Sequence, residues 1–332
     1  VFQSLSRASN AKDSDGAVNF FKTVINDGSE YIWSVNDLPG GATNTAVNIV
    51  NSTSTAPTTL NFQDGSDGLS EANCSISDLM RAYDKFASAE SVDISLVLSG
   101  KARGANTDYY TQLGNYLIDN IAESRKDCVV FLSPASTSVV RQGVGTEVSN
   151  ITSTRNNLRS SSYAVLDTGY KYQYDKYNDV YRYIPLNGDT AGLCVRTDDT
   201  RDPWFSPAGF NRGQIKNIVK LAYNPGKADR DVLYKAGVNP VVTFPGQGTI
   251  LYGDKTLLAQ ASAFDRINVR RLFIVLEKAI ARAAKSLLFE FNDDFTRAQF
   301  KNIVEPFLRD VQGRRGITAY KVVCDETNNT GQ

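Results

Sequence analysis

The chain of 332 residues contains no histidine. This absence excludes the Ser-His-Asp and Cys-His arrangements of nucleophilic catalysis, histidine general bases, and metal sites that need an imidazole ligand. Carboxylate, lysine and N-terminal chemistry stay open, but the commonest catalytic machinery is missing. We therefore expect a protein that is not an enzyme and that uses no cofactor or metal.

Cysteine is scarce as well. The four cysteines are scattered and form no C-x-x-C pair: Cys74, Cys128, Cys194 and Cys324. Cys128 and Cys324 lie in apolar, strand-like runs, where a reduced, buried thiol is typical, and this favours a reducing compartment during synthesis. The chain has one methionine, Met80, and begins at Val1, so we expect an excised piece of a longer protein.

Excess charge of either sign is also absent. The 36 basic and 36 acidic side chains cancel, so no overall charge attracts nucleic acid or an anionic membrane. No apolar run approaches the roughly 18–20 residues of a membrane span. We expect neither nucleic-acid binding nor membrane insertion.

What the chain does contain is a regular alternation of strand and helix signals. Short apolar, β-branched runs at 92–98, 128–132 and 163–166 predict strands, and helical spacing lies between them at 108–125 and 145–158. Strands and helices in this order predict parallel strands joined by right-handed crossovers. The first predicted domain, residues 1–165, is therefore α/β.

The second predicted domain, residues 166–332, has a different pattern. Its tyrosine-rich residues 170–183 predict an antiparallel strand pair. Two amphipathic helices follow, at 264–291 and 295–311, and residues 317–324 predict a closing strand. The expected fold class of the whole chain is mixed α/β (α+β).

The loops at the carboxyl ends of parallel strands are where α/β folds usually bind ligands. In this chain they are the loops after the predicted strands 92–98 and 128–132. Neither loop contains the G-x-G-x-x-G pattern that holds a dinucleotide. An α/β enzyme or nucleotide-binding protein that uses these two loops is the alternative interpretation.

The long helix predicted at 264–291 has two different faces. Apolar residues at helical spacing form a stripe that we expect to face the core: Val269, Leu272, Phe273, Leu276, Ile280, Ala283 and Leu287. Basic residues form a ridge within about 60° of one another on the opposite side: Arg271, Lys278, Arg282 and Lys285. Ile274 and Val275 flank the ridge, where a solvated face rarely carries two β-branched apolar residues. This second face is a predicted partner surface.

At this helix the chain also resembles a known family. The matching segments, in order, are Gly188 to Gly209, Ala228 to Leu257, Ile267 to Ile280 (INVRRLFIVLEKAI), Phe289 to Asp293 (FEFND) and Tyr320 to Asn329 (YKVVCDETNN). Together they resemble the contractile tail sheath proteins of myovirus-type phages. For the fold, the resemblance implies a non-catalytic, subtilisin-like α/β sheath domain followed by a C-terminal α+β sheath domain.

For function, the resemblance implies a structural polymer in the virion, made in the host cytoplasm. Sheath subunits stack around a tail tube and contract, which drives the tube through the host envelope during genome delivery. The implied partners are other sheath subunits, the tail tube protein, and baseplate and tail terminator proteins. The terminal arms that link neighbouring subunits are expected to be missing from this fragment.

On the same resemblance, one set of residues is the candidate tube or subunit interface: Arg271, Ile274, Val275, Lys278, Arg282 and Lys285. Charge contacts suit an interface that must release on contraction, because each exposed ion pair is weak.

Overall fold

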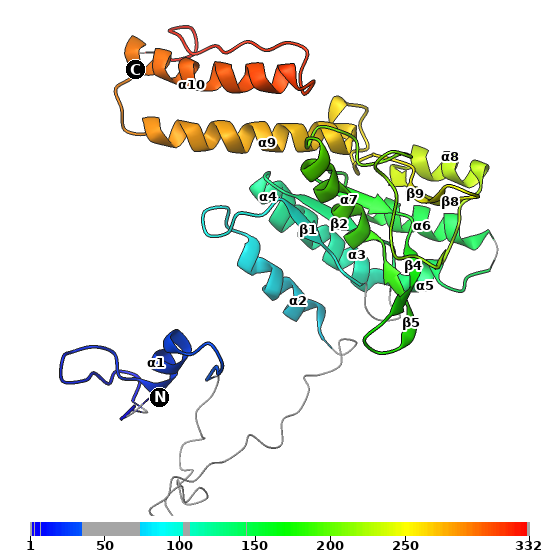
Figure 1. Ribbon diagram of the computed structural model, residues 1–332, viewed down its shortest axis with the longest axis horizontal. Coiled ribbons are helices and arrows are strands. Elements are labelled where there is room, and N and C mark those ends of the chain that lie inside the picture. The colour runs from blue at the N-terminus through cyan, green and yellow to red at the C-terminus, as the bar shows by residue number, and fades with distance from the viewer. Residues whose placement is uncertain are drawn as a thin grey trace, which may run out of the picture. The chain divides into compact units, whose positions relative to one another are not determined.

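The computed structural model divides into two compact units, Val1–Asp67 and Gly68–Gln332 (Figure 1). The residues that it describes are 2, 4–6, 8–34, 74–101, 107–143 and 145–330. In the first unit the described part contains helix α1 (Phe21–Gly28) and isolated bridges between Ser6 and Phe20 and between Lys12 and Val18. None of the described residues of this unit is buried.

The second unit is built on a four-stranded parallel sheet in the order β1-β2-β3-β7. Its strands are Leu96–Leu98 (β1), Val129–Leu132 (β2), Ala164–Asp167 (β3) and Val238–Asn239 (β7). Strands β2 and β3 are buried along their whole length, so both faces of the sheet are covered. The predicted parallel strands and the mixed α/β fold class are confirmed.

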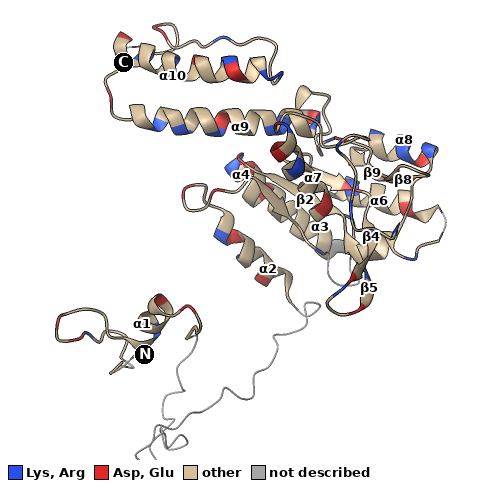
Figure 2. Cartoon of the chain, viewed as in Figure 1, with Lys and Arg blue, Asp and Glu red and all other residues tan. Residues whose placement is uncertain are grey.

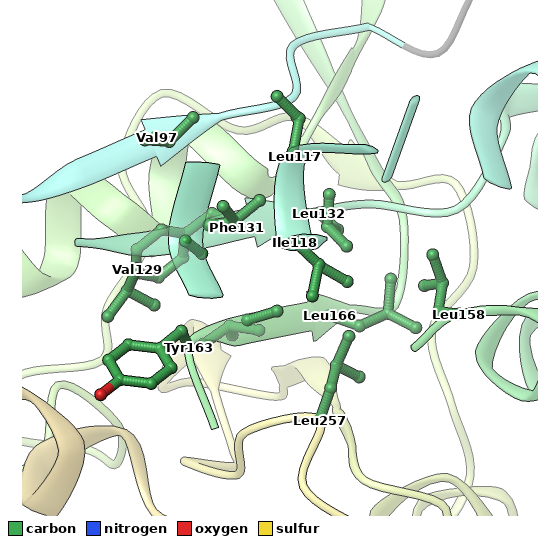
Figure 3. Packing of buried hydrophobic residues seen from close by; sticks show 14 of the residues in the cluster. Val97, Leu117, Ile118, Val129, Phe131, Leu132, Leu158, Tyr163, Leu166 and Leu257 are labelled. Carbon is green, nitrogen blue, oxygen red and sulfur yellow. The ribbon is translucent and has the colours of Figure 1, made fainter. Parts of the chain in front are cut away.

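Helices cover the two faces of this sheet. They are α2 (Ile76–Tyr83) with the 3-10 turn η3 (Asp84–Phe86), α3 (Thr107–Tyr116), the π-helical turn η4 (Leu117–Ala122), α4 (Glu123–Arg125), α5 (Ser136–Val139), α6 (Thr146–Asn157) and α7 (Asn187–Thr200). Right-handed crossovers put α3 and α6 on one face, and α7 contacts β1, β2 and β3 from the other. Figure 3 shows part of this core, with Leu132 of β2 and Leu166 of β3 beside Ile118 of η4.

The domain boundary predicted between residues 165 and 166 falls inside β3. The sheet also continues beyond it, because β3 pairs with β7 through Leu166 and Val238. A division at residue 165 would therefore cut through the sheet. The α/β core instead draws on residues up to α9, including Leu233, Leu257 and Ile274.

The predicted tyrosine hairpin is confirmed as β4 (Tyr170–Asp175) and β5 (Val180–Pro185), which pair antiparallel, with β6 (Lys220–Leu221) on the other side of β4. Alternate tyrosines share one face, and the rings of Tyr172 and Tyr183 lie 4.7 Å apart, centroid to centroid. Cross-strand aromatic contacts of this kind stabilise a two-stranded ribbon.

A second hairpin follows helix α8 (Lys227–Lys235). Its strands are β8 (Val241–Phe244) and β9 (Gly248–Leu251), and Val241 and Leu251 are fully buried at its base. The turn η5 (Ala263–Asp265) then leads into the long helix.

The long helix predicted at 264–291 is shorter in the structure. Helix α9 covers Ile267–Ala284, the 3-10 turn η6 covers Lys285–Leu287, and α10 covers Asp294–Gly313. Leu272 and Leu276 of α9 pack with Val304 and Leu308 of α10 in a separate apolar cluster around Trp204. The strand expected at 317–324 is wrong, since these residues form no strand. Among the described residues, no helix is both long and apolar enough to cross a bilayer.

Candidate interface surfaces

Helix α9 carries the predicted interface, but its first half is buried. Arg271 is 7% exposed and forms an ion pair with Asp198 of α7, and Ile274 is 5% exposed within the α/β core. The prediction that these two residues lie on an exposed face is therefore wrong. The physical reason is that α9 packs on two sides, with Ile267 and Ile274 toward the sheet and Leu272 toward α10.

Lys278, one turn further on, binds its own chain. Its Nζ lies 2.7 Å from Oδ1 of Asp93 and donates to the carbonyl oxygen of Ile94 at 2.6 Å. The hydrogen bond and positive charge of Lys278 hold the pKa of Asp93 below its ordinary value. Lys278 therefore ties α9 to the segment that enters β1.

The remaining predicted residues are more accessible. Arg282 is exposed and lies 3.5 Å from the Asp93 carboxylate, Lys285 is exposed in η6, and Val275 is half-buried. Within the described residues, Lys285 has no carboxylate within 4.0 Å. Lys126, Lys278, Arg282 and Lys285 border a cavity of about 410 Å³, which Asp93, Asp127 and Glu277 also line. Figure 2 shows Lys and Arg repeated along α9. We call Lys126, Lys278, Arg282 and Lys285 the basic face.

The turn between α9 and α10 and the first residues of α10 expose large apolar side chains that the sequence analysis placed in helices. Their exposed fractions are 62% for Leu288, 105% for Phe289, 84% for Phe291 and 77% for Phe295. The same turn carries the exposed carboxylates of Glu290, Asp293 and Asp294. We call Leu288–Phe295 the apolar tip; clustered exposed apolar residues of this kind mark interaction sites.

One sequence signal marks the end of the apolar tip at the start of α10. The Asp293 carboxylate accepts a hydrogen bond from the Thr296 amide at 2.8 Å and caps α10. An Asp three residues before a Thr in the motif FNDDFT is a helix start signal. This signal agrees with the predicted start of the second helix, but it does not show that the preceding helix ends at Leu287, before Phe289 and Phe291.

The loops of the alternative interpretation meet in a buried polar network at the carboxyl ends of the strands. Ser133 Oγ lies 2.7 Å from the Asp167 carboxylate and accepts the Asn187 amide at 2.9 Å, and Asn187 Nδ2 donates to the Gly100 carbonyl oxygen at 2.8 Å. Burial raises the pKa of Asp167 well above its ordinary value. These polar groups bind one another, and within the described residues no three His, Cys, Asp or Glu side chains could hold a metal ion.

Comparison with known protein families assigns the chain to a family. The family model of the phage tail sheath protein central domain matches residues 73–257, and that of the phage tail sheath C-terminal domain matches residues 259–332. The chain belongs to the phage tail sheath family. The family resemblance inferred from the sequence is confirmed. The match to the C-terminal domain, residues 259–332, includes helices α9 and α10.

Two curated relatives are close in sequence. The tail sheath protein of Vibrio phage KVP40 is 49% identical over 284 residues, which are 82% of this chain and 42% of that protein. The tail sheath protein of Enterobacteria phage T4 is 46% identical over 275 residues, with 80% and 42% covered. The chain thus spans less than half the length of these relatives.

A solved structure shares the fold. The helical sheath of the anti-feeding prophage in its contracted state superimposes with a TM-score of 0.56 at 17% identity, over 76% of this chain and 63% of that one. At this identity the likeness concerns the fold alone.

The Lys278 contacts predict a specific loss of stability. Replacing Lys278 by Ala removes the hydrogen bonds to Asp93 and Ile94, and we expect the free energy of unfolding to fall by about 1 kcal/mol, since the pair is partly exposed. Urea denaturation followed by circular dichroism measures this. Lys285→Ala is the matched control and should stay within about 0.5 kcal/mol of the parent. Equal effects of the two substitutions would contradict the assignment.

The buried carboxyl of Asp167 predicts a pH dependence. Because its pKa is raised in the folded state, the folded chain holds this proton more tightly than the unfolded chain does. This contribution to stability is complete below the unfolded pKa of about 3.9 and is lost as pH rises through the folded pKa.

Asp167→Asn removes that loss, so its unfolding free energy should fall less than the parent's between about pH 4 and pH 8. Chemical denaturation at several pH values measures the difference. The exposed Asp199→Asn is the control and should follow the parent. Parallel curves for all three chains would refute the buried neutral carboxyl.

Proposed function

We propose that this chain is part of a sheath subunit that polymerises around the tail tube of a contractile phage. Contraction of the polymer then drives the tube through the host envelope. The observation that carries the proposal is the match of two successive sheath domains, residues 73–257 and 259–332, along nearly all of the second unit. The proposed partners are further sheath copies, the tail tube protein, and baseplate and tail terminator proteins.

We propose that the subunit acts in the virion, is made in the host cytoplasm and catalyses no reaction. The absence of catalysis is supported by the carboxyl ends of the strands, where an α/β enzyme would place its reacting groups. Ser133, Asp167 and Asn187 are all buried there and bond to one another.

The first proposed contact surface is the basic face, in contact with a neighbouring subunit or with the tube. Arg282 and Lys285 are its accessible members. The apolar tip carries Glu290, Asp293 and Asp294, opposite in sign to the basic face, which favours a neighbouring subunit. Two different complementary patches on one chain produce head-to-tail assembly, either as a closed ring or as an open helical polymer.

Electron microscopy tests the proposed function directly. The full-length protein that contains this chain, purified alone and with its tail tube protein, should form tubular polymers. Only monomers or small closed oligomers under both conditions would contradict it.

Charge reversal tests the basic face. In the full-length protein, Arg282→Glu with Lys285→Glu should reduce polymer yield several-fold at low salt, because like charges then face each other. The melting temperature should stay near the parent's, since both side chains are exposed. Pelleting assays and electron microscopy measure the yield, and an unchanged yield argues against this surface.

A charge swap separates the two proposed partners. Adding Glu290→Lys and Asp294→Lys to that reversed chain restores opposite charges if the tip of one copy meets the basic face of the next. Recovered self-assembly identifies a neighbouring subunit. If polymers form without the tube and only tube attachment is lost, the tube is the partner.

The apolar tip gives a separate prediction. Replacing Phe289 and Phe291 by Ser should weaken polymer contacts, because each buried phenylalanine contributes roughly 1.5–3 kcal/mol. Folding should be unaffected, since both rings are exposed in the subunit. Sedimentation of polymers measures the effect, with the exposed Tyr177→Ser on β4–β5 as a matched aromatic control. Equal loss in both variants would remove the special role of the tip.

A further inference from the structure

A basic pocket lies away from the basic face and the apolar tip, between the ends of α6 and α8. Its volume is about 400 Å³, and Arg155, Lys235 and Lys255 line it with Asp265. The Asp265 carboxylate is already shared with Arg266, whose Nε is 3.3 Å away. Within the described residues, none of the three lining cations has a carboxylate within 4.0 Å.

Arg155 is the most constrained of these cations. It is 8% exposed, and burial lowers the pKa of its guanidinium. Its Nη2 donates to the carbonyl oxygen of Leu257 at 2.8 Å, while its Nε has no hydrogen-bond partner among the described residues. A buried charge held by carbonyl oxygens alone is poorly compensated, so a nearby anion would stabilise it.

The backbone brings this cation close to the end of α8. Gly237, directly after the helix, has a φ of 84°, and a Cβ at this position would lie 3.6 Å from Arg155 Nε and 3.4 Å from the Thr256 carbonyl oxygen. A larger residue would be strained by this φ, although its Cβ would make only ordinary van der Waals contact with Arg155. Glycine therefore permits the left-handed backbone with which the chain leaves α8 beside the guanidinium.

The helix ends themselves do not neutralise the pocket. Arg155 lies in the last turn of α6 and Lys235 in that of α8, where each helix contributes a partial charge of about −0.5. Together the two ends supply about −1 against three cations. Arg266 is shared between Asp265 and Asp254, so one carboxylate charge stays uncompensated and a positive excess of about one charge remains.

We propose that this pocket binds an oxyanion, either a phosphate group or the carboxylate of an acidic side chain. Lys235 and Lys255 supply the exchangeable ammonium donors at its edge, and Arg155 supplies the fixed positive charge behind them. Ammonium and guanidinium groups form their strongest hydrogen bonds with these anions. The site is independent of polymer formation.

Calorimetric titration and thermal shift of the purified chain test the site with inorganic phosphate and, separately, with glutarate as a dicarboxylate. Sodium chloride at equal ionic strength controls for screening. We expect saturable binding of at least one anion and a higher melting temperature in its presence. Binding of phosphate alone identifies the phosphate class, and binding of glutarate alone or more tightly identifies the carboxylate class.

The matched variants remove two charges each. Lys235→Ala with Lys255→Ala should weaken anion binding about tenfold or more, while Lys216→Ala with Lys227→Ala, exposed lysines outside the pocket, should leave it unchanged. Circular dichroism checks that both fold. No saturable binding of either anion, or equal weakening in both double variants, would overturn the proposal.

Discussion

The burial of α9 on two sides is the constraint on which the second unit depends. Ile267 and Ile274 join the α/β core, and Leu272 and Leu276 join the cluster around Trp204 and α10. Between these faces, the Arg270 guanidinium lies 4.1 Å from the ring centroids of both Tyr163 and Phe264. The helical pair α9–α10 is thus fixed to the sheet mainly by apolar burial and by this stacked guanidinium. The ion pairs of Arg271 and Lys278 add to this attachment.

The same constraint divides α9 along its length. The segment from Ile267 to Leu276 is mostly buried, whereas the last turns, with Arg282, and the apolar tip beyond them are exposed. A rigid helix anchored at one end presents its other end in a fixed geometry. Partner contacts placed there are preorganised, so little conformational entropy is lost when they form.

The sequence predicted the elements well and the environment of α9 poorly. Strands β2 and β3 and the tyrosine hairpin follow from their β-branched and alternating residues, and the sheath motifs gave the family. Helical spacing shows that a face is apolar, but not how many neighbours the helix has. Arg271 looked exposed by its residue type, and its partner Asp198, on α7, could be known only from the fold. The turn between α9 and α10 was missed because the predicted helix extended to residue 291, beyond the end of η6 at Leu287.

The strengths of the exposed contacts would suit the proposed sheath polymer, whose subunits would have to rearrange on contraction. Exposed pairs such as those available to Arg282 and Lys285 contribute about 0.2–1 kcal/mol each and weaken with salt. Buried phenylalanines of the apolar tip would contribute roughly 1.5–3 kcal/mol each without a fixed direction. Non-directional burial tolerates rotation of one subunit against another, whereas charge pairs set the register. An interface built from both can keep neighbours attached while their relative orientation changes, with each α/β core preserved as a rigid body.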